Sequence, residues 1–189
     1  TQVRALIAQT EKTHGGIDIL VNAVGGSTIV KNAQATVEEL TFEDWQKLIN
    51  FNLNATFLFC NASIPVMKRA GSGKIVNLSS IAGRGLSAKS SGAYAAAKGG
   101  IIAFTRKLSI ELGPFGVNVN AIAPSLTLTE RLMPHWDKRT AADQAVEIDA
   151  VPLKRIATAV DQARVIAFLA SQDADFVTGL TIDVSGGLS

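Results

Sequence analysis

Apolar positions follow two periodicities along the chain, and their alternation predicts a regular succession of helices and strands. Apolar side chains three or four residues apart indicate helices, whereas short continuous runs of Ile, Leu and Val indicate buried strands. The predicted helices cover residues 3–12, 41–69, 92–112 and 158–171. The predicted strands cover residues 17–24, 74–78, 117–122 and 180–184, and residues 124–151 form a more polar segment.

Strands that alternate with helices favour an α/β fold, a Rossmann-like parallel sheet with helices on both faces. Such sheets bind ligands beyond the carboxyl ends of their strands. Functional residues are therefore expected in the loops that follow Val24, Leu78, Ile122 and Val184.

Length and composition indicate one globular domain. The chain has 189 residues, of which 47% are hydrophobic and 18% are charged, and this balance excludes a disordered polar chain. Lys and Arg number 18 against 16 Asp and Glu, and the basic residues are scattered. We therefore expect no nucleic-acid partner.

Residues 48–67 carry no charge and are long enough to span a bilayer, but the amides of Asn50, Asn52, Asn54 and Asn61 would be costly in hydrocarbon. A buried helix is the better interpretation, with no membrane partner. The single cysteine, Cys60, is typical of a reducing compartment, and we expect a cytoplasmic protein.

Tyr94 and Lys98 form the clearest chemical pair in the sequence. A spacing of four places both side chains on one helical face. A free phenol has a pKa near ~10, and a neighbouring ammonium group favours the phenolate, so Lys98 is expected to lower the pKa of Tyr94. A Tyr and a Lys at this spacing are more often ordinary surface residues, so the pair alone is a weak signal.

Two further polar residues strengthen the signal. Ser80 ends the segment 75–80, which begins as a buried strand, and lies 14 residues before Tyr94. Its hydroxyl could bind a substrate oxygen beside the phenol, or could merely cap the next turn. Asn52 lies within an apolar helix, where an amide needs partners.

Together these patterns resemble the short-chain dehydrogenase/reductase family over essentially the whole chain. Within the family the sequence is similar to 3-oxoacyl-acyl-carrier-protein reductases and to sugar or polyol dehydrogenases. The matching segments are Leu20-Val21-Asn22-Ala23-Val24-Gly25, the helix with Asn52, Ser80-Ile81-Ala82-Gly83, the pair Tyr94 and Lys98, residues 118–124 followed by Thr129, and residues 176–187.

The resemblance implies an oxidoreductase that interconverts a ketone and a secondary alcohol with NADP or NAD. Tyr94 would be the general acid or base, Lys98 would bind the nicotinamide ribose, Ser80 would polarise the carbonyl, and Asn52 would hold a water that relays protons. The substrate would be a small-molecule or acyl-thioester carbonyl compound. The implied cofactor-binding residues are Asn22, Ala23, Gly25, Tyr94, Lys98, Pro124, Ser125, Thr127 and Thr129.

The resemblance also implies a homo-oligomer that associates through the helices over residues 41–69 and 92–112. Phe57, Phe59, Ile101 and Phe104 cannot all face one sheet, which agrees with that expectation. No metal site is expected.

Three departures from the family pattern stand out. Ala23 replaces the usual second asparagine, and Ser125 replaces the usual glycine after Pro124. The sequence contains neither G-x-G-x-x-G nor T-G-x-x-x-G-x-G. We therefore interpret residues 1–189 as the carboxyl-terminal portion of a single dinucleotide-binding domain without its first three strands. The strand over residues 17–24 is then expected to be an exposed edge, with weak cofactor affinity and low solubility for the chain alone.

Two other functions remain open at this stage. A non-catalytic dinucleotide-binding or scaffolding relative would have lost part of the set Asn52, Ser80, Tyr94 and Lys98, yet all four are present. A serine hydrolase would need a G-x-S-x-G turn, which is absent. His14 is expected on the surface, and Arg155 in a structural role. His135 and Trp136 either touch substrate or simply cover the site.

Overall fold

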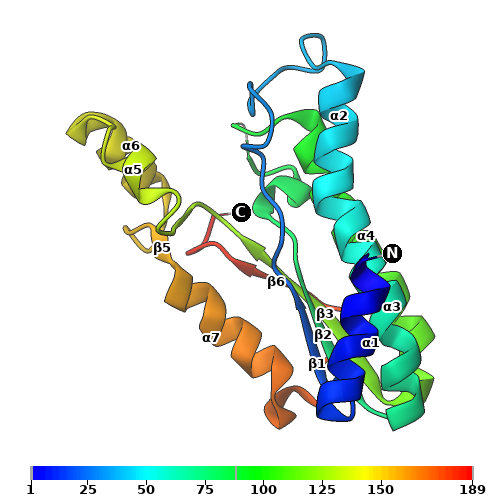
Figure 1. Ribbon diagram of the computed structural model, residues 1–189. Coiled ribbons are helices and arrows are strands. Elements are labelled where there is room, and N and C mark those ends of the chain that lie inside the picture. The colour runs from blue at the N-terminus through cyan, green and yellow to red at the C-terminus, as the bar shows by residue number, and fades with distance from the viewer. Residues whose placement is uncertain (1, 88, 189) are drawn as a thin grey trace.

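Four parallel strands form the central sheet of the computed structural model, which describes residues 2–87 and 89–188. Their order is β1-β2-β3-β6 (Figure 1), and neighbouring strands pair in parallel throughout. A second, two-stranded parallel sheet pairs β4 with β5. The strands are β1 (Ile19–Asn22), β2 (Gly73–Leu78), β3 (Val117–Pro124), β4 (Thr127–Leu128), β5 (Ala157–Thr158) and β6 (Thr181–Val184).

Helices cover both faces of the sheet, as the alternating pattern predicts. Helices α1, α3 and α4 lie on one side and α7 on the other, while the small helices α5 and α6 lie near β5 (Figure 1). The helices are α1 (Gln2–His14), α2 (Phe42–Ile49), α3 (Ala55–Ala70), α4 (Gly92–Leu112), α5 (Met133–Trp136), α6 (Ala141–Ala150) and α7 (Ala159–Ala170). Within the described residues, no helix is both long and apolar enough to cross a membrane.

Successive residues of β2 belong to two separate hydrophobic clusters, one on each face of the sheet, because side chains alternate between the faces of a strand. Ile75 packs with Cys60 of α3 and Leu108 of α4. Val76 packs instead with Ile122 and with Leu169 of α7. This arrangement confirms the predicted α/β fold.

Strand β1 is shorter and more exposed than the sequence predicts. The predicted strand covers residues 17–24, whereas the structure pairs only Ile19–Asn22. Among the described residues β1 pairs with β2 alone, so Ile19 remains 49% exposed and Val21 40% exposed. The predicted edge strand is therefore confirmed for this chain.

The predicted helix over residues 41–69 is interrupted. Thr41 accepts a hydrogen bond from the Asp44 N–H at 3.1 Å and so begins α2 as expected. A π-helical turn, η1 (Asn50–Asn54), then separates α2 from α3, which ends at Gly71 in the left-handed conformation. The spacing of apolar residues in the sequence does not predict this π-helical turn, because apolar residues recur through residues 50–54 as they do in the helices on either side.

The polar segment over residues 124–151 holds more regular structure than the sequence analysis indicates. It contains β4, α5 and α6, and the Thr140 hydroxyl caps α6 by accepting from the Asp143 N–H. No residue of α6 is buried, so its apolar pattern is weak.

Candidate functional site

The four predicted catalytic residues come from three elements that meet beyond the carboxyl end of β2. Ser80 caps the 3₁₀ turn η2 (Ile81–Arg84), and its hydroxyl accepts from the Ala82 N–H at 3.1 Å. The buried hydroxyl of Ser91 caps α4 and sets the first turn that carries Tyr94. Lys98 lies one turn further along α4, with its Nζ 5.8 Å from the centre of the Tyr94 ring.

Lys98 is a buried amine attached to the end of β2. Its side chain is 4% exposed, and Nζ donates to the main-chain oxygen of Leu78 at 2.8 Å. Burial disfavours the charged ammonium group and lowers the pKa of Lys98 to about 8. Leu78 O is the only protein acceptor of Nζ in the described part of the chain. Because an ammonium group has three N–H bonds, two donors remain for a ligand.

The pKa of Tyr94 moves in the direction opposite to the sequence-based expectation. Burial of the phenol raises the pKa of Tyr94, because a phenolate is poorly solvated there. A hydrogen bond with the Ser80 side chain and the positive charge of Arg131 oppose this increase without cancelling it. The positive charge that opposes the increase is that of Arg131, whereas the sequence analysis expects this influence from Lys98.

Asn52 lies at the centre of the π-helical turn, where its side chain binds a loop far away in sequence. Oδ1 accepts from the Gly26 N–H at 2.9 Å, and Nδ2 donates to the Gly26 oxygen at 3.1 Å. Nδ2 also donates to the Leu48 oxygen at 2.9 Å. Both amide N–H bonds are therefore occupied, and Asn52 holds the loop that follows β1.

Two glycines allow the elements of the site to approach one another. A Cβ on Gly25 would lie 2.7 Å from Asn52 Oδ1 and 2.9 Å from Lys98 Nζ. A Cβ on Gly83 would lie 2.6 Å from the Lys98 carbonyl carbon and 2.7 Å from the Gly99 nitrogen. Since both Gly83 contacts are with backbone, the turn with Ser80 packs directly on α4.

Apart from Tyr94 and Lys98 of α4, the predicted cofactor-binding residues lie at or just beyond the carboxyl ends of β1 and β3, but several already have protein partners. The Asn22 amide donates to Asn77 Oδ1 at 2.8 Å and to Cys60 Sγ at 3.3 Å, so its N–H groups face the core. The Thr127 hydroxyl donates to the Ser125 oxygen and accepts from Gln162. The main-chain oxygen of Thr129 accepts from the N–H groups of Leu132 and Met133 at the start of α5. Ala23 is exposed, whereas Gly25, Pro124 and Ser125 are half-buried.

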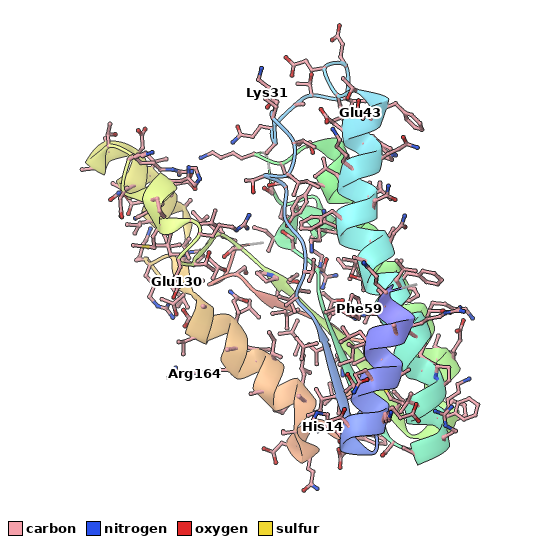
Figure 2. The ribbon with its side chains drawn as sticks, viewed as in Figure 1. His14, Lys31, Glu43, Phe59, Glu130 and Arg164 are labelled. Carbon is pink, nitrogen blue, oxygen red and sulfur yellow. The ribbon has the colours of Figure 1, made fainter. Side chains whose placement is uncertain are left out.

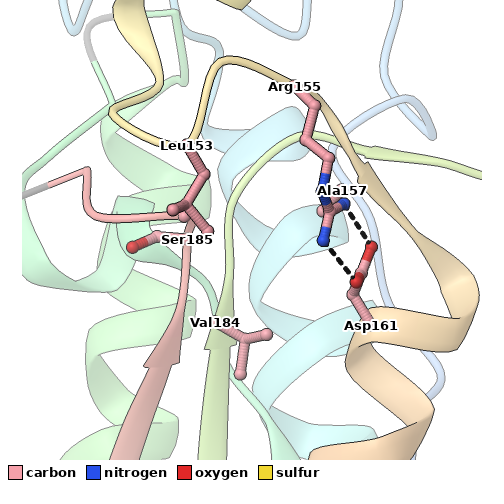
Figure 3. A pocket seen from close by; sticks show the side chains of 7 residues that line it. Leu153, Arg155, Ala157, Asp161, Val184 and Ser185 are labelled. Atoms are coloured by element: carbon pink, nitrogen blue, oxygen red, sulfur yellow. Dashed lines mark hydrogen bonds and ion pairs between the residues drawn. The ribbon is translucent and has the colours of Figure 1, made fainter.

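A separate cavity of about 180 Å³ lies between the end of β6 and the start of α7 (Figure 3). Arg155 borders it and binds Asp161 through two hydrogen bonds of 2.7 and 2.8 Å. This ion pair holds the pKa of Asp161 well below its usual range. Arg155 thus braces the first turn of α7, as the sequence analysis expects.

The two histidines occupy different parts of the molecule. His14 ends α1 at the opposite end of the sheet from Glu130 (Figure 2) and is exposed, as predicted. His135 is also exposed, whereas Trp136 is buried against Val151 and Ile156. Trp136 therefore serves as the core of the segment over residues 124–151.

Sequence reasoning overlooks two residues beside the site, Gly26 and Arg131. Two consecutive glycines, Gly25 and Gly26, indicate a backbone conformation that other residues rarely adopt, and Gly26 has a φ of 148°. Arg131 carries no such signal, because it is one of several scattered basic residues in a polar segment.

The whole chain has close counterparts among known proteins. Residues 1–189 match the family model described as enoyl-(acyl carrier protein) reductase. Levodione reductase from Leifsonia aquatica is 34% identical over 195 residues, which covers 100% of this chain and 70% of that protein.

Two solved structures share the arrangement of elements. A 3-oxoacyl-[acyl-carrier protein] reductase with bound NAD from Brucella melitensis is 35% identical, with a TM-score of 0.83, and the match covers 98% of this chain and 67% of that chain. ElxO with NADP bound is 30% identical, with a TM-score of 0.90, and the match covers 99% of this chain and 73% of that chain.

Proposed function

Because the chain belongs to the short-chain dehydrogenase/reductase family, we propose that it interconverts a ketone and a secondary alcohol with NAD or NADP. The observation that carries the proposal is the convergence of Ser80, Tyr94, Lys98 and Asn52 at one end of the sheet. These side chains are separated by up to 46 residues in the sequence, yet hydrogen bonds hold them at this end. Asn52 binds the loop that follows β1, and Lys98 binds the last residue of β2. Tyr94 and Ser80 are hydrogen-bonded to each other.

The residues present fit the nicotinamide end of a dinucleotide. Lys98 Nζ retains two unused donors in a buried position, which suits the hydroxyl groups of a ribose. Gly25 leaves open the space in front of Asn52 Oδ1 and Lys98 Nζ, which a side chain would fill. When bound, the dinucleotide supplies or accepts the hydride.

The chain's own residues supply the proton and the orientation. Ser80 donates a hydrogen bond to the substrate carbonyl oxygen, which becomes an alkoxide as its carbon gains the hydride. Tyr94 gives its phenolic proton to that oxygen, and the alcohol leaves neutral. Its raised pKa keeps the phenol protonated and ready for reduction. Oxidation of an alcohol follows the same steps in reverse.

The relatives named above act on different carbonyl compounds, so the substrate class proposed here stays broad: a small ketone or a 3-oxoacyl thioester. We also propose that the protein associates with itself through α3 and α4. Phe57 of α3 and Ile110 of α4 leave 47% and 63% of their surface exposed, and a second copy would cover them. Ile101, in contrast, is fully buried within one chain.

The Tyr94→Phe variant of the full-length protein tests the reaction. Loss of the phenolic proton is expected to lower kcat by roughly 10²- to 10⁴-fold, while the thermal unfolding midpoint and cofactor affinity stay near those of the wild type. Ketone reduction is followed by the absorbance of NADH and NADPH. Near wild-type kcat in Tyr94→Phe would falsify the proposed role, and a wild-type protein that binds cofactor without any turnover would favour the non-catalytic relative.

A further inference from the structure

Arg131 reaches the candidate site from the segment between β4 and α5. Its Nη1 donates to the Thr28 hydroxyl at 2.8 Å, across 103 residues of sequence. Both terminal nitrogens lie 3.5 Å from the position that a Cβ of Gly26 would occupy. Gly26 is the residue whose peptide groups bind Asn52. The guanidinium group therefore lies next to the loop that borders the proposed catalytic residues.

Arg131 is a cation without an acidic partner in the described part of the chain. Within residues 2–87 and 89–188, no carboxylate forms an ion pair with it, whereas Arg84 binds Asp183 and Arg155 binds Asp161. Its one protein acceptor in the same residues is the neutral Thr28 hydroxyl. A guanidinium group has five N–H donors, so most of its capacity to bind an anion is unused. An incoming anion would displace a hydroxyl and would not have to break an ion pair.

The position of Arg131 favours the substrate over the cofactor as the source of that anion. The Gly25-Gly26 segment joins Arg131 to the site, because Gly26 lies beside the guanidinium group and Gly25 lies against Asn52 Oδ1 and Lys98 Nζ. The positive charge of Arg131 also favours the ionised form of the Tyr94 phenol. A substrate held by Tyr94 and Ser80 would place its neighbouring atoms within the same field. Guanidinium binds carboxylates through paired, charge-assisted hydrogen bonds.

We propose that Arg131 is a specificity-determining residue that binds the carboxylate of an oxo-acid substrate, beside Gly26 and Thr28. This inference rests on the proposed ketone chemistry for its substrate but concerns binding, which is measured separately. The variants are Arg131→Met, which removes the positive charge, and Arg131→Lys, which keeps the charge but lacks the planar guanidinium group that binds both carboxylate oxygens. Arg164→Met is the matched control, because Arg164 is exposed on α7 (Figure 2) and away from the site.

The experiment compares 3-oxobutanoate and 4-oxopentanoate with their methyl esters in the full-length protein with cofactor. Wild-type kcat/KM is expected to favour the acids. Arg131→Met should lower kcat/KM for the acids by roughly 10- to 100-fold and leave the esters within about threefold, so that the preference disappears. Arg131→Lys should keep part of the preference, and Arg164→Met all of it. The KM for the cofactor should not change in any variant.

Calorimetric titration with 4-oxopentanoate makes the inference independent of turnover. Binding that weakens at least tenfold in Arg131→Met supports the carboxylate site even if no ketone is reduced, in which case only the proposed function fails. Equal binding to both proteins, or no binding to the wild type, overturns the inference. Equal losses for acids and esters, or a loss of cofactor affinity with an unchanged acid preference, also overturn it.

Discussion

Lys98 donates a 2.8 Å hydrogen bond from Nζ to the main-chain oxygen of Leu78, the last residue of β2. This bond attaches the second turn of α4 to the carboxyl end of the sheet. Ser79, the next residue, donates from its hydroxyl to the Lys98 oxygen at 2.7 Å. The two bonds run in opposite directions between the same short segments, so the strand that leads to Ser80 and the helix that carries Tyr94 are held together.

The lowered pKa of Lys98 predicts a specific pH dependence of stability. Its pKa is about 8 in the folded chain, and near 10.5 when it is unperturbed. Between these values the unfolded chain binds more protons than the folded one, so stability rises with pH across that window. Below pH 8 the full penalty for the buried charge is present, and above pH 10.5 it is absent.

Urea unfolding at pH 7.5, 9 and 10 measures this effect. The free energy of unfolding of the wild type should increase relative to that of Lys98→Met, by at most ~1.4 kcal/mol per pH unit for one proton. Lys107→Met is the matched control, since Lys107 is exposed on the same helix. Parallel curves for wild type and Lys98→Met would show that Lys98 keeps an ordinary pKa.

Gly83→Ala is expected to disturb the site through backbone contact. The new methyl group would lie 2.6–2.8 Å from the carbonyl and amide atoms of Lys98 and Gly99, which cannot move as a side chain would. We expect a loss of about 1–3 kcal/mol in the free energy of unfolding, together with reduced turnover. Gly16→Ala is the control, because its Cβ would meet no atom within 4 Å. Equal stabilities of the two variants would mean that η2 can retreat from α4.

Cys60 is expected to be chemically inert in the folded chain. Its side chain is fully buried, and burial raises the pKa of the thiol to about 12, despite a hydrogen bond from Asn22 that acts in the other direction. Since the thiolate is the reactive form, Ellman's reagent at pH 8 should label less than a tenth of the thiol within an hour. In urea the same reagent should label one thiol per chain. Rapid labelling without urea would show that α3 separates readily from the sheet.

Glu147 is expected to restrain the helix α6. Its carboxylate pairs with Arg139 at 3.0 Å and with Lys89, which lies in the loop between Ser80 and Tyr94. These cations lower the pKa of Glu147. Because partly exposed pairs contribute about 0–1 kcal/mol, Glu147→Gln should speed amide hydrogen exchange over residues 141–150 by up to about fivefold, with little change in global stability.

Asp149→Asn is the matched control for Glu147→Gln. Asp149 belongs to the same helix, but its carboxylate is 76% exposed and lies 3.9 Å from Lys154. Exchange over residues 141–150 should stay at the wild-type rate in this variant. Identical exchange in both variants would mean that the pairs with Lys89 and Arg139 do not hold α6 in place.

Local sequence was sufficient for the features that depend on neighbouring residues. The period of the apolar positions predicts α4 over residues 92–112, which is the range that the structure shows. Thr41 and Gly71 mark helix ends because their capping interactions span only one turn. The spacing of Tyr94 and Lys98 places them on one helical face, and the reaction class follows from the resemblance of these motifs to the short-chain dehydrogenase/reductase family.

Tertiary contacts decided the rest, since they depend on residues that are distant in sequence. Sequence spacing attributes the influence on the Tyr94 phenol to Lys98, but burial dominates it and the opposing charge comes from Arg131. Asn52 lies in a π-turn and its amide binds Gly26, a partner that periodicity cannot reveal. Burial and long-range charge are properties of the assembled fold. The sequence by itself therefore identified the residues that we propose carry the chemistry, whereas the packing of three separate segments determined their burial and the direction of their pKa shifts.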